Sequence, residues 1–124
     1  MHIKSEGEYI MNYIYHLENE PYNQISSGNK TVEFRLNDEK RQLLQVGDTI
    51  EFENLINHQM LKVKIIELYK KDSFAELINA LKEKQIEFLK DVSIDDMVEQ
   101  LRHFYSEEKE QQYGVLGIEF IIEN

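Results

Sequence analysis

The 124-residue sequence contains no cysteine, a single proline and no long apolar run. Without cysteine the chain cannot form disulfides, use a thiol in catalysis or bind zinc through thiolates. The four histidines are scattered and lack the close spacing of a structural zinc site, so we expect no metal and no cofactor. No segment reaches membrane-spanning length, and the N-terminus lacks the apolar core of a secretory signal. We therefore expect a soluble, cytoplasmic protein without a membrane partner.

The charge balance is acidic, with 14 basic and 24 acidic residues giving a net charge of −10. This excess argues against a protein that holds nucleic acid by a broad cationic surface. It is concentrated towards the ends of the chain, because residues 30–81 carry a net charge of only −1. An anionic ligand would have to be attracted locally by one of two groups of cations. These are Lys30, Arg35, Lys40 and Arg41, and Lys62, Lys64, Lys70 and Lys71.

A half-buried strand is predicted at the end of the stretch from Ser27 to Arg35. Val32 and Phe34 alternate with Glu33 and Arg35, which is the period of a strand with one face in the core. We expect Val32 and Phe34 to be buried and the two charged side chains to project from the other face. The alternative is a solvated face that carries an ordinary surface ion pair.

Three charged side chains of this stretch, Lys30, Glu33 and Arg35, are the candidate ligand-binding residues. Lys30 precedes the strand, so it would lie beside Glu33 and Arg35. The two cations could bind a phosphate or carboxylate, and the carboxylate could accept a hydrogen bond from a base amino group. A nearby cation would favour the neutral, basic form of the lysine and a carboxylate would oppose it, so the sequence leaves its protonation open. Tyrosines that could stack on a nucleobase are Tyr69, Tyr105 and Tyr113, although packing residues are the alternative.

The predicted elements run in the order strand, helix, several strands, a helical insertion and a final strand. The predicted strands cover residues 11–17, 31–36, 49–54, 61–69 and 115–122, and helices start near Pro21, Ser73, Ser93 and Ser106. Gly28 can take the positive φ that ends the first helix. The order favours a single α+β domain over residues 1–124, with an antiparallel sheet and with residues 1–10 as a loose N-terminal extension. We assign the apolar stripes of the helices to the core.

The run from Gly28 to Arg35 resembles the G-x-K-x-x-E-x-R signature of ASCH domains. The similarity extends from about Tyr13 to the C-terminus and includes the turn at residues 46–48 and the closing segment 113–118, which look like those of small bacterial ASCH proteins. It implies a PUA-like fold, a small antiparallel β-barrel with flanking helices and a cleft beside the signature strand. It also implies binding of RNA or a nucleotide-like ligand, which is the function that we favour.

Two other functions remain open on the resemblance. One branch of the family hydrolyses the amide of N4-acetylcytidine with a lysine, a threonine and a glutamate. Lys30 lies at the lysine position, Glu33 occupies the threonine position and Glu76 could correspond to the glutamate. If the protein is an enzyme, Lys30 and Glu33 would be catalytic, with Glu33 as a general base on water. The third possibility is a protein-interaction adaptor in the regulation of transcription or translation, and the sequence does not indicate the oligomeric state.

Overall fold

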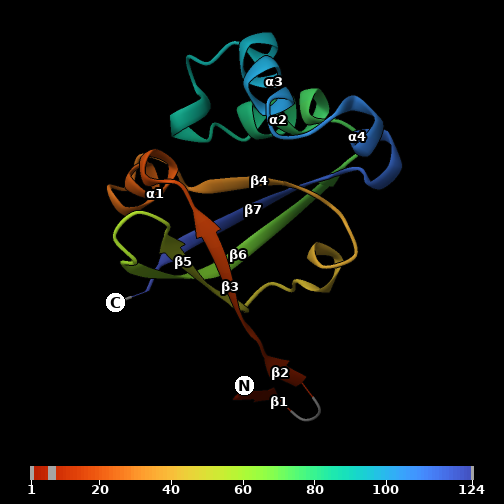
Figure 1. Ribbon diagram of the computed structural model, residues 1–124. Helices are drawn as coiled ribbons and strands as arrows, with labels where there is room; N and C mark the ends of the chain where they lie inside the picture. Colours follow the sequence, from red (N-terminus) through yellow and green to blue (C-terminus); the bar gives the residue numbers. More distant parts are fainter. Residues whose placement is uncertain (1, 6–7, 124) are drawn as a thin grey trace. The chain divides into compact units, whose positions relative to one another are not determined.

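The computed structural model describes residues 2–5 and 8–123 and divides the chain into two compact units. Of the described residues, the first unit contains 2–5, 8–32, 45–67 and 119–123, and the second contains 33–44 and 68–118. Figure 1 shows the elements of both units. None of the helices in the described residues is long and apolar enough to cross a membrane.

The larger sheet has five strands in the order β3-β5-β6-β7-β4. Their bounds are Asn12–Leu17 for β3, Val32–Leu36 for β4, Thr49–Asn54 for β5, Met60–Lys71 for β6 and Val115–Ile122 for β7. Strands β5 and β6 form the predicted antiparallel hairpin, in which Phe52 lies opposite Leu61. Strand β3, however, pairs with β5 in parallel, with Tyr13 opposite Ile50. The sheet is therefore mixed and not wholly antiparallel as predicted, because the chain between β3 and β5 is long enough for a crossover connection.

The core of the first unit is formed by α1 (Asn19–Ser26) and by the strand residues that belong to this unit. Its buried apolar residues are Leu17, Tyr22, Ile25, Val32, Ile50, Phe52, Val63, Ile65 and Phe120. The Phe52 ring lies 5.8 Å from that of Phe120 and 6.3 Å from that of Tyr15, measured between centroids. Gly28 follows α1 with φ of +83°, which confirms the predicted helix-ending glycine.

A second sheet of two strands was not predicted. Strands β1 (His2–Ser5) and β2 (Glu8–Ile10) pair antiparallel within the segment that we expected to be an N-terminal extension. These strands are short and their sequence has no clear alternation, so periodicity gave no signal for them.

The second unit holds the helical insertion. It contains α2 (Phe74–Glu83), α3 (Ile94–Arg102), α4 (Glu107–Tyr113) and two 3-10 turns, η1 (Arg41–Leu43) and η2 (Glu87–Leu89). Each α-helix begins at a predicted serine cap: the side chains of Ser73, Ser93 and Ser106 each accept a hydrogen bond from the N–H three residues later. Its core consists of Phe34, Leu44, Phe74, Leu77, Ile78, Leu81, Leu89, Val115, Leu116 and Ile118.

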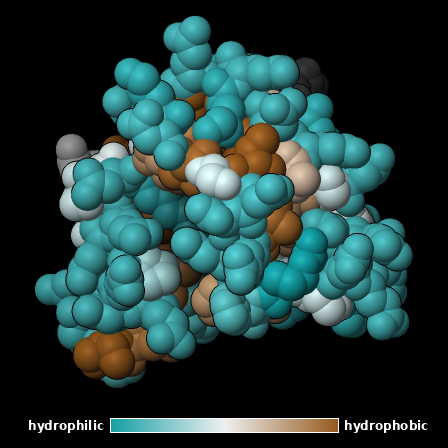
Figure 2. All heavy atoms as spheres, turned by 90° about the horizontal axis from the view of Figure 1, so that it is seen from above, coloured by the Kyte–Doolittle hydropathy of each residue, from teal (hydrophilic) through white to brown (hydrophobic). Residues whose placement is uncertain are grey.

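The apolar stripe of α3 is less buried than predicted. No side chain of α3, all of which the structure describes, is fully buried, and Phe104 is 74% exposed. Phe104 leaves the stripe because the helix ends at Arg102, two residues earlier. Figure 2 shows hydrophobic side chains left uncovered among the hydrophilic residues of the face that it presents. With these differences, the predicted α+β fold is confirmed.

Candidate functional site

Strand β4 carries a largely buried ion pair in the second unit. The Arg35 Nη2 atom donates to Glu33 Oε2 at 3.1 Å, and the two side chains are 18% and 6% exposed. The other carboxylate oxygen, Oε1, accepts the N–H of Phe34 at 3.2 Å. Val32 and Phe34 are buried as predicted, but Glu33 and Arg35 do not form the solvated surface pair that was the alternative. At this depth their interaction is less screened than on a surface, and removing either partner leaves a buried charge.

Tyr105 adds a phenol to the same strand from the loop after α3. Its hydroxyl donates to the carbonyl oxygen of Phe34 at 3.4 Å. Burial raises the pKa of Tyr105, the charge of Arg35 acts in the opposite direction and the charge of Glu33 adds to the increase. The hydrogen bond to Phe34, which stands between Glu33 and Arg35 in β4, places the phenol close to the buried pair.

A second ion pair lies beside this phenol, in the segment that follows β4. The Arg41 Nη1 atom is 3.7 Å from Asp38 Oδ2, and the backbone N–H of Arg41 donates to Asp38 Oδ1 at 3.1 Å. Both charges also act on the pKa of Tyr105, Arg41 lowering it and Asp38 raising it. We name these five residues the signature cluster: Glu33, Arg35, Asp38, Arg41 and Tyr105.

The signature cluster combines groups that suit a polar ligand with an aromatic part. Its two guanidinium groups can bind phosphate or carbonyl oxygens in a forked geometry, and its two carboxylates can accept hydrogen bonds from amino groups. The ring of Tyr105 lies 5.5 Å from that of Phe74, so one ring of the cluster is held by an aromatic neighbour. The formal charges of the cluster cancel. It would therefore bind a ligand through individual hydrogen bonds and not through a strong net electrostatic field.

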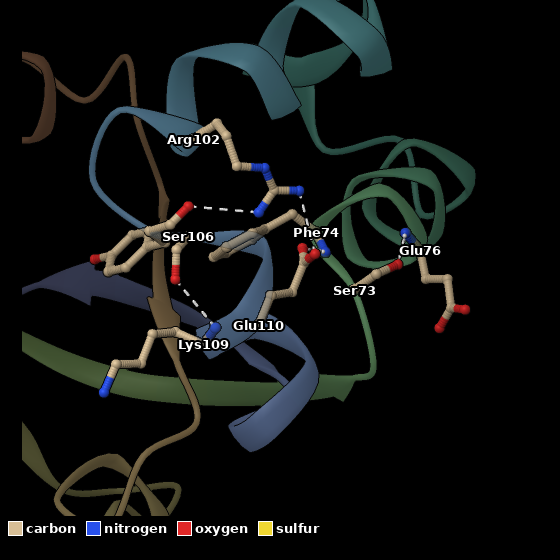
Figure 3. A network of polar contacts seen from close by, with 8 residues as sticks. Ser73, Phe74, Glu76, Arg102, Ser106, Lys109 and Glu110 are labelled. Atoms are coloured by element: carbon tan, nitrogen blue, oxygen red, sulfur yellow. Dashed lines mark hydrogen bonds and ion pairs between the residues drawn. The ribbon is translucent and has the colours of Figure 1, made fainter.

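The other residues proposed from the sequence lie elsewhere. Lys30 is half-buried in the first unit, and its N–H donates to the carbonyl oxygen of Gln24 at 3.0 Å. Its participation with Glu33 and Arg35 therefore stays a prediction. Glu76 is exposed on α2, with its N–H bonded to Ser73, and Figure 3 shows its side chain pointing away from the contacts around Glu110. Within the described residues, no group of three or more His, Asp or Glu side chains is placed to hold a metal ion.

A buried glutamate that the sequence did not reveal holds the helices around Tyr105. Glu110 accepts the N–H of Phe74 at 2.7 Å and Arg102 Nη2 at 3.2 Å (Figure 3). The other terminal nitrogen of Arg102 donates to the carbonyl oxygen of Tyr105 at 3.4 Å. Glu110 thus links α4 to the start of α2, and through Arg102 it positions the loop that carries Tyr105. Its only sequence signal is a glutamate in a short polar helix, which is typical of a solvated residue.

Residues 16–123 match the model of the ASCH domain family. The chain belongs to the ASCH domain family. This ASCH domain is similar to the crystal structure of hypothetical protein PH0355, with a TM-score of 0.77, 34% identity and coverage of 91% of this chain and 100% of that one. It is also similar to the solution structure of protein PF0455 from Pyrococcus furiosus, with a TM-score of 0.66, 35% identity and coverage of 90% and 97%.

A more distant structure is similar to this ASCH domain in fold, and its low sequence identity supports no conclusion about function. The crystal structure of protein EF3133 from Enterococcus faecalis V583 has a TM-score of 0.60 and 15% identity, with coverage of 91% of this chain and 76% of that one. A comparison with curated proteins gave no match. Family membership, which the sequence signature predicted, is therefore confirmed.

Proposed function

We propose that this ASCH domain binds RNA or a nucleotide-like ligand at the signature cluster, with Glu33 and Arg35 as direct ligands. The observation that carries the proposal is the burial of their ion pair, 6% and 18% exposed, beside the phenol of Tyr105. A buried ion pair contributes little net stability, so its placement next to an aromatic polar group supports a role in recognition.

The proposed roles follow from the donors and acceptors of each side chain. Arg35 would donate to a phosphate or to a base carbonyl oxygen, and Glu33 would accept from a base amino group. Tyr105 would stack on the base. Lys30 is retained as a further proposed ligand on the strength of its place in the signature sequence.

A titration tests the proposal. Fluorescence anisotropy would follow short single-stranded RNA and mononucleotides binding to wild type, Arg35→Ala and Lys40→Ala at two salt concentrations. Arg35→Ala should cost roughly 1–3 kcal/mol of binding free energy, because it removes a forked contact. Lys40 is exposed, outside the cluster, and its replacement should cost much less.

The salt dependence separates this site from a broad cationic surface. Because only a few phosphates would be neutralised, the log–log slope of affinity against salt should be about −1 to −2. Arg35→Lys keeps the charge but loses the fork, so it should bind nearly as weakly as Arg35→Ala. Undetectable binding of wild type at low salt, or equal losses in Arg35→Ala and Lys40→Ala, would contradict the proposal.

A further inference from the structure

A polar groove of about 320 Å³ lies within the second unit, beside the segment that follows β4. This volume is at the lower end of the range for small-molecule sites, roughly 300–1,000 Å³. Three segments line it: the residue after β4, the end of β6 and the end of α4. They contribute Asn37, Lys70, Lys71, Gln111, Gln112 and Tyr113.

Close backbone packing fixes the groove where these segments meet. The Asn37 N–H donates to the carbonyl oxygen of Gly114 at 3.0 Å, so α4 and β4 are joined at this point. Gly114 has φ of +71°, and a Cβ atom there would lie 2.9 Å from the carbonyl oxygen of Lys71. Only glycine fits at this position, where the residue before β7 approaches the last residue of β6. The close approach brings Lys71 next to Asn37 and the end of α4.

The chemistry of the lining favours an oxyanion. The ammonium groups of Lys70 and Lys71 and the side-chain amides are hydrogen-bond donors, while Asp72 contributes one carboxylate, so the lining carries a net charge of +1. In a chain of net charge −10, a local excess of cations is where an anion would be attracted.

We propose that this groove binds a phosphate of an RNA strand whose base is held at the signature cluster. The inference rests on the proposed function and narrows it, because it makes the ligand an oligonucleotide and not a free nucleoside. Asn37 follows Arg35 by two residues, which span about 7 Å of extended chain. A base held at Arg35 therefore has its strand within reach of the groove, and Lys70 and Lys71 would neutralise the adjoining phosphate.

The chain offers a matched control for the two lysines. Lys62 and Lys64 lie on the same strand, β6, are also exposed and do not line the groove. We would compare the double variants Lys70→Gln/Lys71→Gln and Lys62→Gln/Lys64→Gln with wild type, using a fluorescent single-stranded RNA hexamer and a nucleoside without phosphate. The groove variant should lose roughly tenfold in affinity for the hexamer and reduce the salt slope by about 0.7, the value expected for one phosphate of a single strand. Its affinity for the nucleoside should not change, and the control variant should change neither by more than about twofold.

A variant that binds the hexamer more tightly than wild type separates an effect on binding from a loss caused by misfolding. Asp72→Asn removes the one carboxylate of the lining, so it should tighten hexamer binding and steepen the salt slope. Equal losses of hexamer affinity in the two lysine variants, or no gain of affinity in Asp72→Asn, would overturn the groove assignment. A loss of affinity in Arg35→Ala would still support the signature cluster in that case. A wild-type protein that binds no hexamer at low salt would overturn both proposals.

Discussion

Replacing Glu110 should destabilise the fold, although its place in a short polar helix is typical of an exposed residue. Its carboxylate is buried, accepts the N–H of Phe74 at 2.7 Å and pairs with Arg102 at 3.2 Å. Glu110→Ala leaves the Phe74 N–H buried without an acceptor, and a hydrogen bond to a charged group is worth about 1.5–3 kcal/mol. The pair with Arg102 adds up to about 1 kcal/mol, because a third of the arginine side chain is exposed. We therefore expect the free energy of unfolding to fall by about 1.5–4 kcal/mol.

Urea denaturation followed by circular dichroism measures this loss, with Glu108→Ala as the matched control in the same helix. Glu108 is exposed, and alanine favours helix slightly more than glutamate, so the control should change stability by less than about 0.5 kcal/mol. Glu110→Gln keeps a carbonyl acceptor for the Phe74 N–H and should fall between the two. If Glu110→Ala is no less stable than Glu108→Ala, the reasoning about this buried carboxylate is wrong.

The remaining predictions concern stability, titration and catalysis. Gly114→Ala should destabilise the fold by more than Gly28→Ala in urea denaturation, because both glycines have positive φ but only Gly114 has a backbone carbonyl within 2.9 Å of the added Cβ. The raised pKa of Tyr105 contributes stability that is complete below the unfolded value of about 10 and is lost as pH rises through the folded value. Wild type should therefore lose more stability than Tyr105→Phe as the pH rises above about 10. Acetate release from N4-acetylcytidine should be weak or absent, because Glu33 occupies the position of the hydrolase threonine; turnover that disappears in Lys30→Met would reverse this expectation.

The features that could be predicted from sequence are local ones. The alternation along β4 predicted the burial of Val32 and Phe34 but not that of Glu33, whereas Gly28 and the three serine caps predicted where helices end and begin. Each of these signals lies within a few residues of the feature that it specifies, since caps, turns and strand faces are set by neighbouring side chains.

The features that could not be predicted depend on contacts between distant parts of the chain. Tyr105 reaches the carbonyl of Phe34 across 71 residues, and Glu110 reaches the N–H of Phe74 across 36. Their residue types are as typical of a solvated surface as of a buried site, so the pattern did not separate the two. The parallel pairing of β3 with β5 is likewise a property of the topology and not of either strand's sequence.

An NMR titration with a short single-stranded RNA tests the central claim most directly, because it locates the ligand as well as detecting it. In wild type, the amide signals of Phe34, Arg35 and Tyr105 should shift progressively, and those of the exposed loop residues Leu55 and Ile56 should not. The shifts should disappear in Arg35→Ala at the same RNA concentration. Absence of any shift in wild type, or shifts in the loop without shifts in β4, would contradict binding at the signature cluster.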